Sequence, residues 1–198
     1  MGFKMGAIAG FAAGYYLGAK AGRERYEQIN RFERILSDVQ QKTGMRMLAW
    51  CLMPNHWHLV LWPREDGELS QFVRLVTLTH AQRWHAHRGT AGMGHLYQGR
   101  FKSFVVRADD HLLTVCRYVE ANALRGGLVA RAEDWRWSSL GRSAGGGPTI
   151  EPWPVPKPPQ WAAYVNEQCS REELDRLRSS TLRPRGRPRK KVPDTFFR

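Results

Sequence analysis

Apolar and polar residues alternate along this chain with two different periods, and these periods predict its elements. Apolar positions three and four residues apart predict amphipathic helices over residues 23–44 and 68–88, the second ended by Gly89. A third such helix starts near residue 110, where Asp109 or Asp110 is placed to cap it. Short apolar runs predict strands at 46–53, 56–62 and 101–106, and none before residue 45. Helices mixed with a small sheet indicate an α+β fold.

The first two strands form a predicted hairpin around Pro54-Asn55. Side chains of a strand alternate between its faces, so residues two apart point the same way. His56 and His58 therefore share one face of the second strand, together with Val60 and Trp62, while Trp57 points to the other.

The N-terminal segment has a different pattern. Residues 5–19 are uncharged, and glycine recurs at every fourth position from Gly2 to Gly22. A helix formed there would carry a glycine ridge suited to close helix contacts. Its 15 residues fall short of the ~20 that span a bilayer, which disfavours a membrane helix. Ala19-Lys20-Ala21 loosely resembles a signal-peptide cleavage site, but we rank a weakly ordered or surface-associated helix above both alternatives.

The C-terminal part is rich in breakers and then in charge. Residues 141–159 contain four Gly and six Pro and indicate a linker or a wrapped extended segment. A capping box, Ser170 to Glu173, opens a short helix, and the residues after Leu182 are basic and interrupted by proline. We therefore divide the chain into residues 1–22, 23–140, 141–181 and 182–198.

Charge points to a polyanionic partner. The chain carries 31 Lys+Arg against 18 Asp+Glu, a net charge of +13, of which residues 176–198 supply +8. Such an excess favours nucleic acid before an anionic membrane. The three cysteines lack the spacing of a disulfide framework or a CxxC site. A cytoplasmic, nucleoid-associated location follows as the expectation.

Two clusters carry the chemistry. His56 and His58 can converge on one small cation, while Tyr118 and Asn122, four apart in a predicted helix, share a helix face. A His-x-His pair alone is weak evidence for a metal. With an amide oxygen it makes a mixed N/O site for a divalent ion, and Tyr118 adds a phenol that a nearby cation can activate as a nucleophile. This set of residues indicates metal-assisted cleavage of a DNA strand.

MPNHWHLVLWP (residues 53–63) and RYVEANALRGGLV (residues 117–129) together resemble the REP-associated tyrosine transposases, a branch of the single-tyrosine HUH transposases. LTHAQRWHAHRG and GHLYQGRFKSF, which lie between them, fit the same pattern, and the resemblance covers about residues 32–140.

The resemblance implies a ferredoxin-like βαββαβ sandwich that acts on single-stranded or hairpin DNA through a 5′-phosphotyrosine intermediate. It implies Tyr118 as the nucleophile and His56, His58 and Asn122 as ligands of Mg²⁺ or Mn²⁺. Basic residues near this site are the candidates for DNA contact, and a homodimer is left open. These basic residues are Arg100, Lys102, Arg117 and Arg125.

The sequence departs from this family at its start. Members open with a central strand that carries a basic Arg-Gly motif, whereas the glycine-rich segment stands in its place here. We therefore expect the first strand to be missing or replaced, which would leave the sheet incompletely paired. The alternative function is then a catalytically impaired DNA-binding protein derived from such a transposase, with a membrane-associated protein as a more distant third.

The tail contains Arg185-Gly186-Arg187-Pro188, which resembles an AT-hook. An extended Arg-Gly-Arg core fits the narrow minor groove of A·T-rich duplex, whose negative potential favours inserted arginines. The plainer alternative is a basic tail that only adds phosphate contacts.

Overall fold

The computed structural model describes residues 5–8, 22–97, 101–106, 110–141, 147–167 and 172–173. Its strands are β1 (Met5–Ile8), β2 (Arg46–Leu52), β3 (Trp57–Trp62) and β4 (Phe104–Val106). Its helices are α1 (Gly22–Thr43), α2 (Glu68–Arg88), α3 (Asp110–Glu120), α4 (Asn122–Arg125), the 3-10 turn η1 (Ala132–Asp134) and α5 (Trp161–Asn166). Within these residues, no helix combines the length and apolarity needed to cross a bilayer.

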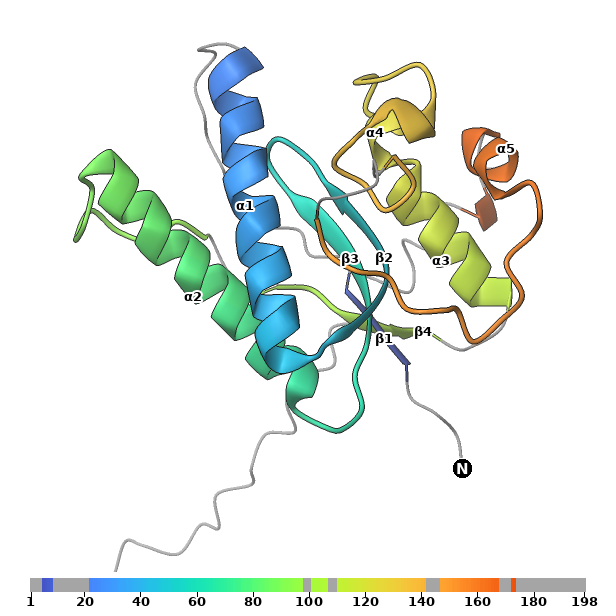
Figure 1. The fold of residues 1–198 in the computed structure, drawn as a ribbon, viewed down its shortest axis with the longest axis horizontal. Coiled ribbons are helices and arrows are strands. Elements are labelled where there is room, and N and C mark those ends of the chain that lie inside the picture. Colours follow the sequence, from blue (N-terminus) through green and yellow to red (C-terminus); the bar gives the residue numbers. More distant parts are fainter. Residues whose placement is uncertain are drawn as a thin grey trace, which may run out of the picture.

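The strands form one antiparallel sheet in the order β2-β3-β1-β4. The elements β1, α1, β2, β3, α2 and β4 follow each other in the predicted βαββαβ order, and the α+β class is confirmed. Helices α1 and α2 lie side by side on one face of the sheet, and α3 covers the other (Figure 1). The sheet thus separates two layers, and each side chain of a central strand belongs to one of them.

The prediction of no strand before residue 45 is wrong, but the expectation that the glycine-rich segment replaces the first strand holds for residues 5–8. Strand β1 lies between β3 and β4 and pairs with both, with Gly6 opposite Leu61 on one side and Val105 on the other. Four residues are too few to show a period of two against the glycine repeat, so the segment was assigned to a helix. That assignment fails for residues 5–8, and the rest of the segment, residues 9–19, lies outside the described residues.

The predicted apolar stripes form the core. Five residues of α1, three of α2 and four of α3 are buried against the sheet or each other, as their spacing predicted. They are Ile29, Phe32, Ile35, Leu36 and Val39, then Phe72, Val73 and Val76, then Leu112, Val115, Cys116 and Val119. Tyr26 continues the same spacing towards the start of α1, but it is 43% exposed and its ring stacks on Trp137.

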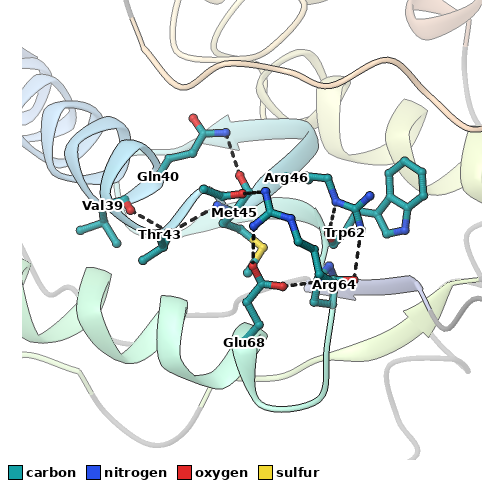
Figure 2. A network of polar contacts seen from close by, with 10 residues as sticks. Val39, Gln40, Thr43, Met45, Arg46, Trp62, Arg64 and Glu68 are labelled. Atoms are coloured by element: carbon teal, nitrogen blue, oxygen red, sulfur yellow. Dashed lines mark hydrogen bonds and ion pairs between the residues drawn. The ribbon is translucent and has the colours of Figure 1, made fainter.

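A polar corner joins the end of α1 to β2 and to the far end of β3 (Figure 2). Gly44 ends the helix with φ +65°, a conformation that side chains disfavour. The Arg64 guanidinium donates to the Gly44 carbonyl oxygen at 2.7 Å and also contacts Glu68. Arg46 Nε donates to the Trp62 carbonyl at 3.0 Å. These bonds hold the start of β2 and the end of β3 against the end of α1. The corner lies at the end of β3 opposite the histidines.

Residues 147–159 wrap along β2, so for them the extended-segment alternative holds. The Glu151 amide donates to the Met47 carbonyl and the Trp153 indole to the Leu48 carbonyl, both at 2.8 Å. Gln40 on α1 bonds Thr149 through both ends of its amide.

His80 lies buried between α1 and α2 and ties the loop after α2 to this layer. Its Nδ1 is 2.5 Å from the Tyr97 hydroxyl, and its ring meets Phe32 edge to face. Burial lowers the pKa of His80 to about 4, so the folded protein holds it neutral.

This burial predicts a loss of stability in mild acid. The unfolded chain takes up a proton on His80 near pH 6.5, whereas the folded chain resists until about pH 4. The free energy of unfolding should therefore fall by roughly 3 kcal/mol as pH drops through this window. Urea unfolding of the wild type and of His80→Gln, measured from pH 7.5 to 4, checks this. The variant should show a shallower pH slope, and equal slopes would contradict the prediction.

Candidate functional site

The start of β3 places the two histidines. Leu52 pairs with Trp57 and Cys51 with His58, so these neighbouring pairs face opposite layers. Trp57 packs on Phe32 of α1 with ring centroids 5.9 Å apart, whereas His58 faces α3. His56 precedes the strand in a turn closed by the Met53 amide and the His56 carbonyl. The two imidazole centroids are nevertheless only 4.9 Å apart.

Helix α3 brings the tyrosine to this pair. The Tyr118 ring centroid is 6.0 Å from that of His58, with the planes at 89°. Asn122 Nδ2 donates to the Tyr118 carbonyl at 3.0 Å, which leaves Oδ1 as the ligand atom of that amide. The Arg125 guanidinium carbon lies 4.3 Å from the Tyr118 ring centroid. Two distant stretches of the chain, residues 56–58 and 118–125, thus meet through the contact of His58 with Tyr118.

Burial sets the charge state of the histidines. It lowers the pKa of His58 to about 3, and the nearby His56 and Arg125 add to this shift. Burial also lowers the pKa of His56. Neutral imidazoles are the form that binds metal ions. Two neutral imidazoles and an amide oxygen suit a divalent ion that accepts both nitrogen and oxygen ligands. Of the two ions expected from the sequence, Mn²⁺ fits this donor set better than Mg²⁺, which prefers oxygen ligands.

Asn55 is a site residue that the sequence interpretation missed. Its Oδ1 lies 2.7 Å from His56 Nδ1. With the proton on Nδ1, this bond holds the ring and leaves the Nε2 lone pair for a ligand bond. The signal was its position directly before the His-x-His pair, where it was assigned only to the turn.

Known proteins share the sequence pattern and the fold of this chain. Residues 22–122 match the family model of IS200-like transposases. The chain belongs to this family. A curated protein of Haemophilus influenzae, named as a REP-associated tyrosine transposase, is 24% identical over 125 residues, or 59% of this chain and 70% of the relative.

The structure is also similar to that of a REP-associated tyrosine transposase solved with a REP hairpin. The TM-score is 0.51 at 16% identity, over 77% of this chain and 95% of the other. At that identity the similarity shows a shared fold. The family resemblance predicted from the two motifs is confirmed.

Two buried polar groups, Glu120 and Arg117, hold α3 in place. Glu120, 1% exposed, accepts from Ser139 Oγ and from Trp161 Nε1, both at 2.5 Å. Burial raises the pKa of Glu120, and these two bonds oppose that shift. The helix that carries Tyr118 is thereby fixed to the C-terminal segment.

Arg117, predicted to contact DNA, lies elsewhere. It is 3% exposed, and its guanidinium bonds the Glu167 carbonyl at 2.9 Å and Glu173 Oε1 at 3.3 Å. The same group lies 4.1 Å from the Tyr164 ring centroid. The guanidinium of Arg117 therefore bonds other residues of the chain. It anchors α3 to the residues after α5, in place of the predicted contact with DNA.

The other predicted basic residues are only partly placed. Lys102 and Arg125 are exposed. Arg100 and the AT-hook-like residues Arg185, Gly186, Arg187 and Pro188 lie outside the described residues.

The two arginines that flank Tyr118 should differ in their effect on stability. Arg117→Met removes a buried ion pair and a backbone hydrogen bond, so the free energy of unfolding should fall by about 2–3 kcal/mol. Arg125→Met alters an exposed side chain and should change it by less than about 0.5 kcal/mol. Urea unfolding of both variants is the measurement, and similar losses would show that Arg117 is no anchor.

Proposed function

We propose that this chain is a metal-dependent transposase that cleaves and rejoins single-stranded or hairpin DNA through a covalent bond to Tyr118. The approach of the Tyr118 ring to His58, from an element some sixty residues away, carries the proposal. Family membership, the net charge of +13 and the REP hairpin bound by the structural relative support DNA as the partner.

The chemistry assigned to Tyr118 is attack on a phosphodiester. Its phenolic oxygen bonds to phosphorus, the 3′-hydroxyl leaves, and the 5′-phosphate stays on the protein. The phosphotyrosine bond keeps the energy needed to rejoin the strand without another cofactor. Arg125, over the Tyr118 ring, places a positive charge beside the side chain that would attack.

His56, His58 and Asn122 would hold the divalent ion. When bound, Mg²⁺ or Mn²⁺ would supply a Lewis acid for the oxygens of the scissile phosphate. The donor set supports this assignment, since burial keeps both imidazoles neutral and Asn55 orients one of them.

The alternative of an impaired DNA-binding protein depended on an incomplete sheet. Strand β1 removes that ground, because it fills the place between β3 and β4. The exposed Lys102 and Arg125 remain proposed DNA contacts, and the tail is proposed to bind A·T-rich duplex.

Tyr118→Phe should abolish the covalent adduct and strand transfer, because it removes only the attacking oxygen. Folding and DNA affinity should stay close to the wild type. Labelled hairpin DNA with Mn²⁺, followed by denaturing electrophoresis and peptide mapping, is the assay. Tyr26→Phe, at an exposed tyrosine away from the site, serves as the control and should retain the adduct. Persistence of the adduct in Tyr118→Phe, or its mapping to Tyr97, would refute the assignment.

Asn55→Ala should weaken Mn²⁺ binding by about 10–100-fold, because it releases the His56 ring without removing a ligand. His56→Ala/His58→Ala should abolish binding while much of the DNA affinity remains. Titration of the metal-free protein, followed by calorimetry or by the electron paramagnetic resonance signal of Mn²⁺, measures both. Unchanged Mn²⁺ affinity in the double variant would exclude this metal site.

A further inference from the structure

A pocket opens on the α1 side of the sheet, directly beside His56. Its aromatic walls come from three parts of the chain, namely Phe32 on α1, Trp57 at the start of β3, and the hydrogen-bonded pair of His80 and Tyr97. His56 lines this pocket and also contacts His58 of the metal pair. The pocket therefore lies against the proposed cleavage site, on the layer opposite Tyr118.

Gln28 supplies an unused polar atom to the same pocket. Its side chain is 9% exposed, and Nε2 donates to Glu24 at 3.5 Å, near the limit of a hydrogen bond. Its Oε1 is buried and has no hydrogen-bond partner among the described residues. An acceptor buried without a donor costs free energy, which indicates a site kept for a ligand.

The lining selects the kind of ligand. Aromatic walls favour a flat ring, and the amides of Gln28 and Asn55 at the wall favour a ring with a polar edge. The described lining residues include no Lys or Arg, so the pocket is unsuited to a phosphate. In a strand whose phosphate lies at His56 and His58, the attached bases are within one nucleotide of this pocket.

We propose that this pocket binds a nucleobase next to the scissile phosphate and that Gln28 Oε1 accepts a hydrogen bond from its amino group. Adenine and cytosine offer an amino group beside a ring acceptor, the pattern that one amide can match with both of its ends. This inference rests on the proposed function, and Gln28 is then a specificity-determining residue with no part in the chemistry.

The test combines selection with stability. Hairpin DNA with randomised single-stranded flanks is incubated with the full chain and Mn²⁺, and the covalent adducts are sequenced. The wild type should enrich adenine or cytosine at one position next to the cleaved bond. Gln28→Met, of similar volume, should reduce that preference by between about five- and a hundredfold. Its melting temperature should stay equal or rise, since the lost oxygen had no partner.

Gln40→Met is the matched control on the same helix. Gln40 is also buried, but its amide bonds Met45 and Thr149, so the variant should melt earlier and keep the base preference. Adducts without any base preference would overturn the pocket assignment while leaving the proposed function standing. A preference that survives Gln28→Met, or melting as early as that of Gln40→Met, would overturn the role of Gln28.

A binding measurement separates this inference from the chemistry. Tyr118→Phe is titrated with hairpin DNA that carries 2-aminopurine at successive flank positions. One position should change its emission on binding as the base enters the aromatic pocket. Because 2-aminopurine lacks the 6-amino group of adenine, Gln28→Met is then compared with the wild type on hairpin DNA that carries adenine at that position, where the variant should bind more weakly. If the wild type forms no adduct, the proposed cleavage is refuted, and this scan still tests whether the pocket binds a base. An emission change at no position, or adenine binding that Gln28→Met leaves unchanged, would reject the proposal.

Discussion

The pairing of β3 on both of its sides is the constraint on which the site depends. Bonded to β2 and to β1, the strand can neither rotate nor slip, and each side chain is committed to one layer. Trp57 is thereby directed to α1 and His58 to α3. A shift of one residue in register would exchange the two and remove the imidazole from Tyr118. Strand β1 therefore matters to the site through its pairing with β3.

Buried polar groups fix the orientation of helix α3 in a similar way. Successive residues of a helix are turned by about 100°, so Arg117, Tyr118 and Glu120 leave in different directions. Arg117 bonds the chain after α5, and Glu120 bonds Ser139 and Trp161. Both anchors are buried: Arg117 is a cation, and Glu120 is a carboxyl group with a raised pKa. Each is therefore stable only in the geometry that keeps its hydrogen-bond partners in place. Tyr118 is placed between them and is left to face His58. The C-terminal segment is thus part of the support of the site.

Local spacing explains which parts were predictable from the sequence. The helices, the β2–β3 hairpin and the shared faces of His56 with His58 and of Tyr118 with Asn122 all follow from periods of two or of three to four. Strand β1 was not predicted, because its four residues, placed within a glycine repeat, are too few to show a period of two. The buried position of Arg117 was not predicted, because its partners, Glu167 and Glu173, are about fifty residues away in the sequence. The sequence did not mark Gln28 as a binding residue, since a polar residue beside the apolar stripe is ordinary in an amphipathic helix.

The proposed cleavage and the proposed recognition of a base lie on opposite faces of the sheet, and His56 contacts both sites. The layer with α3 holds Tyr118 and His58, while the layer with α1 holds an aromatic pocket. His56 lines this pocket and lies 4.9 Å from His58, measured between ring centroids. Since Asn55 and His56 line the pocket and also form the turn that leads to His58, a base bound there would press on the residues that orient the ligand pair. Recognition of the base and alignment of the phosphate would then be coupled through this single turn.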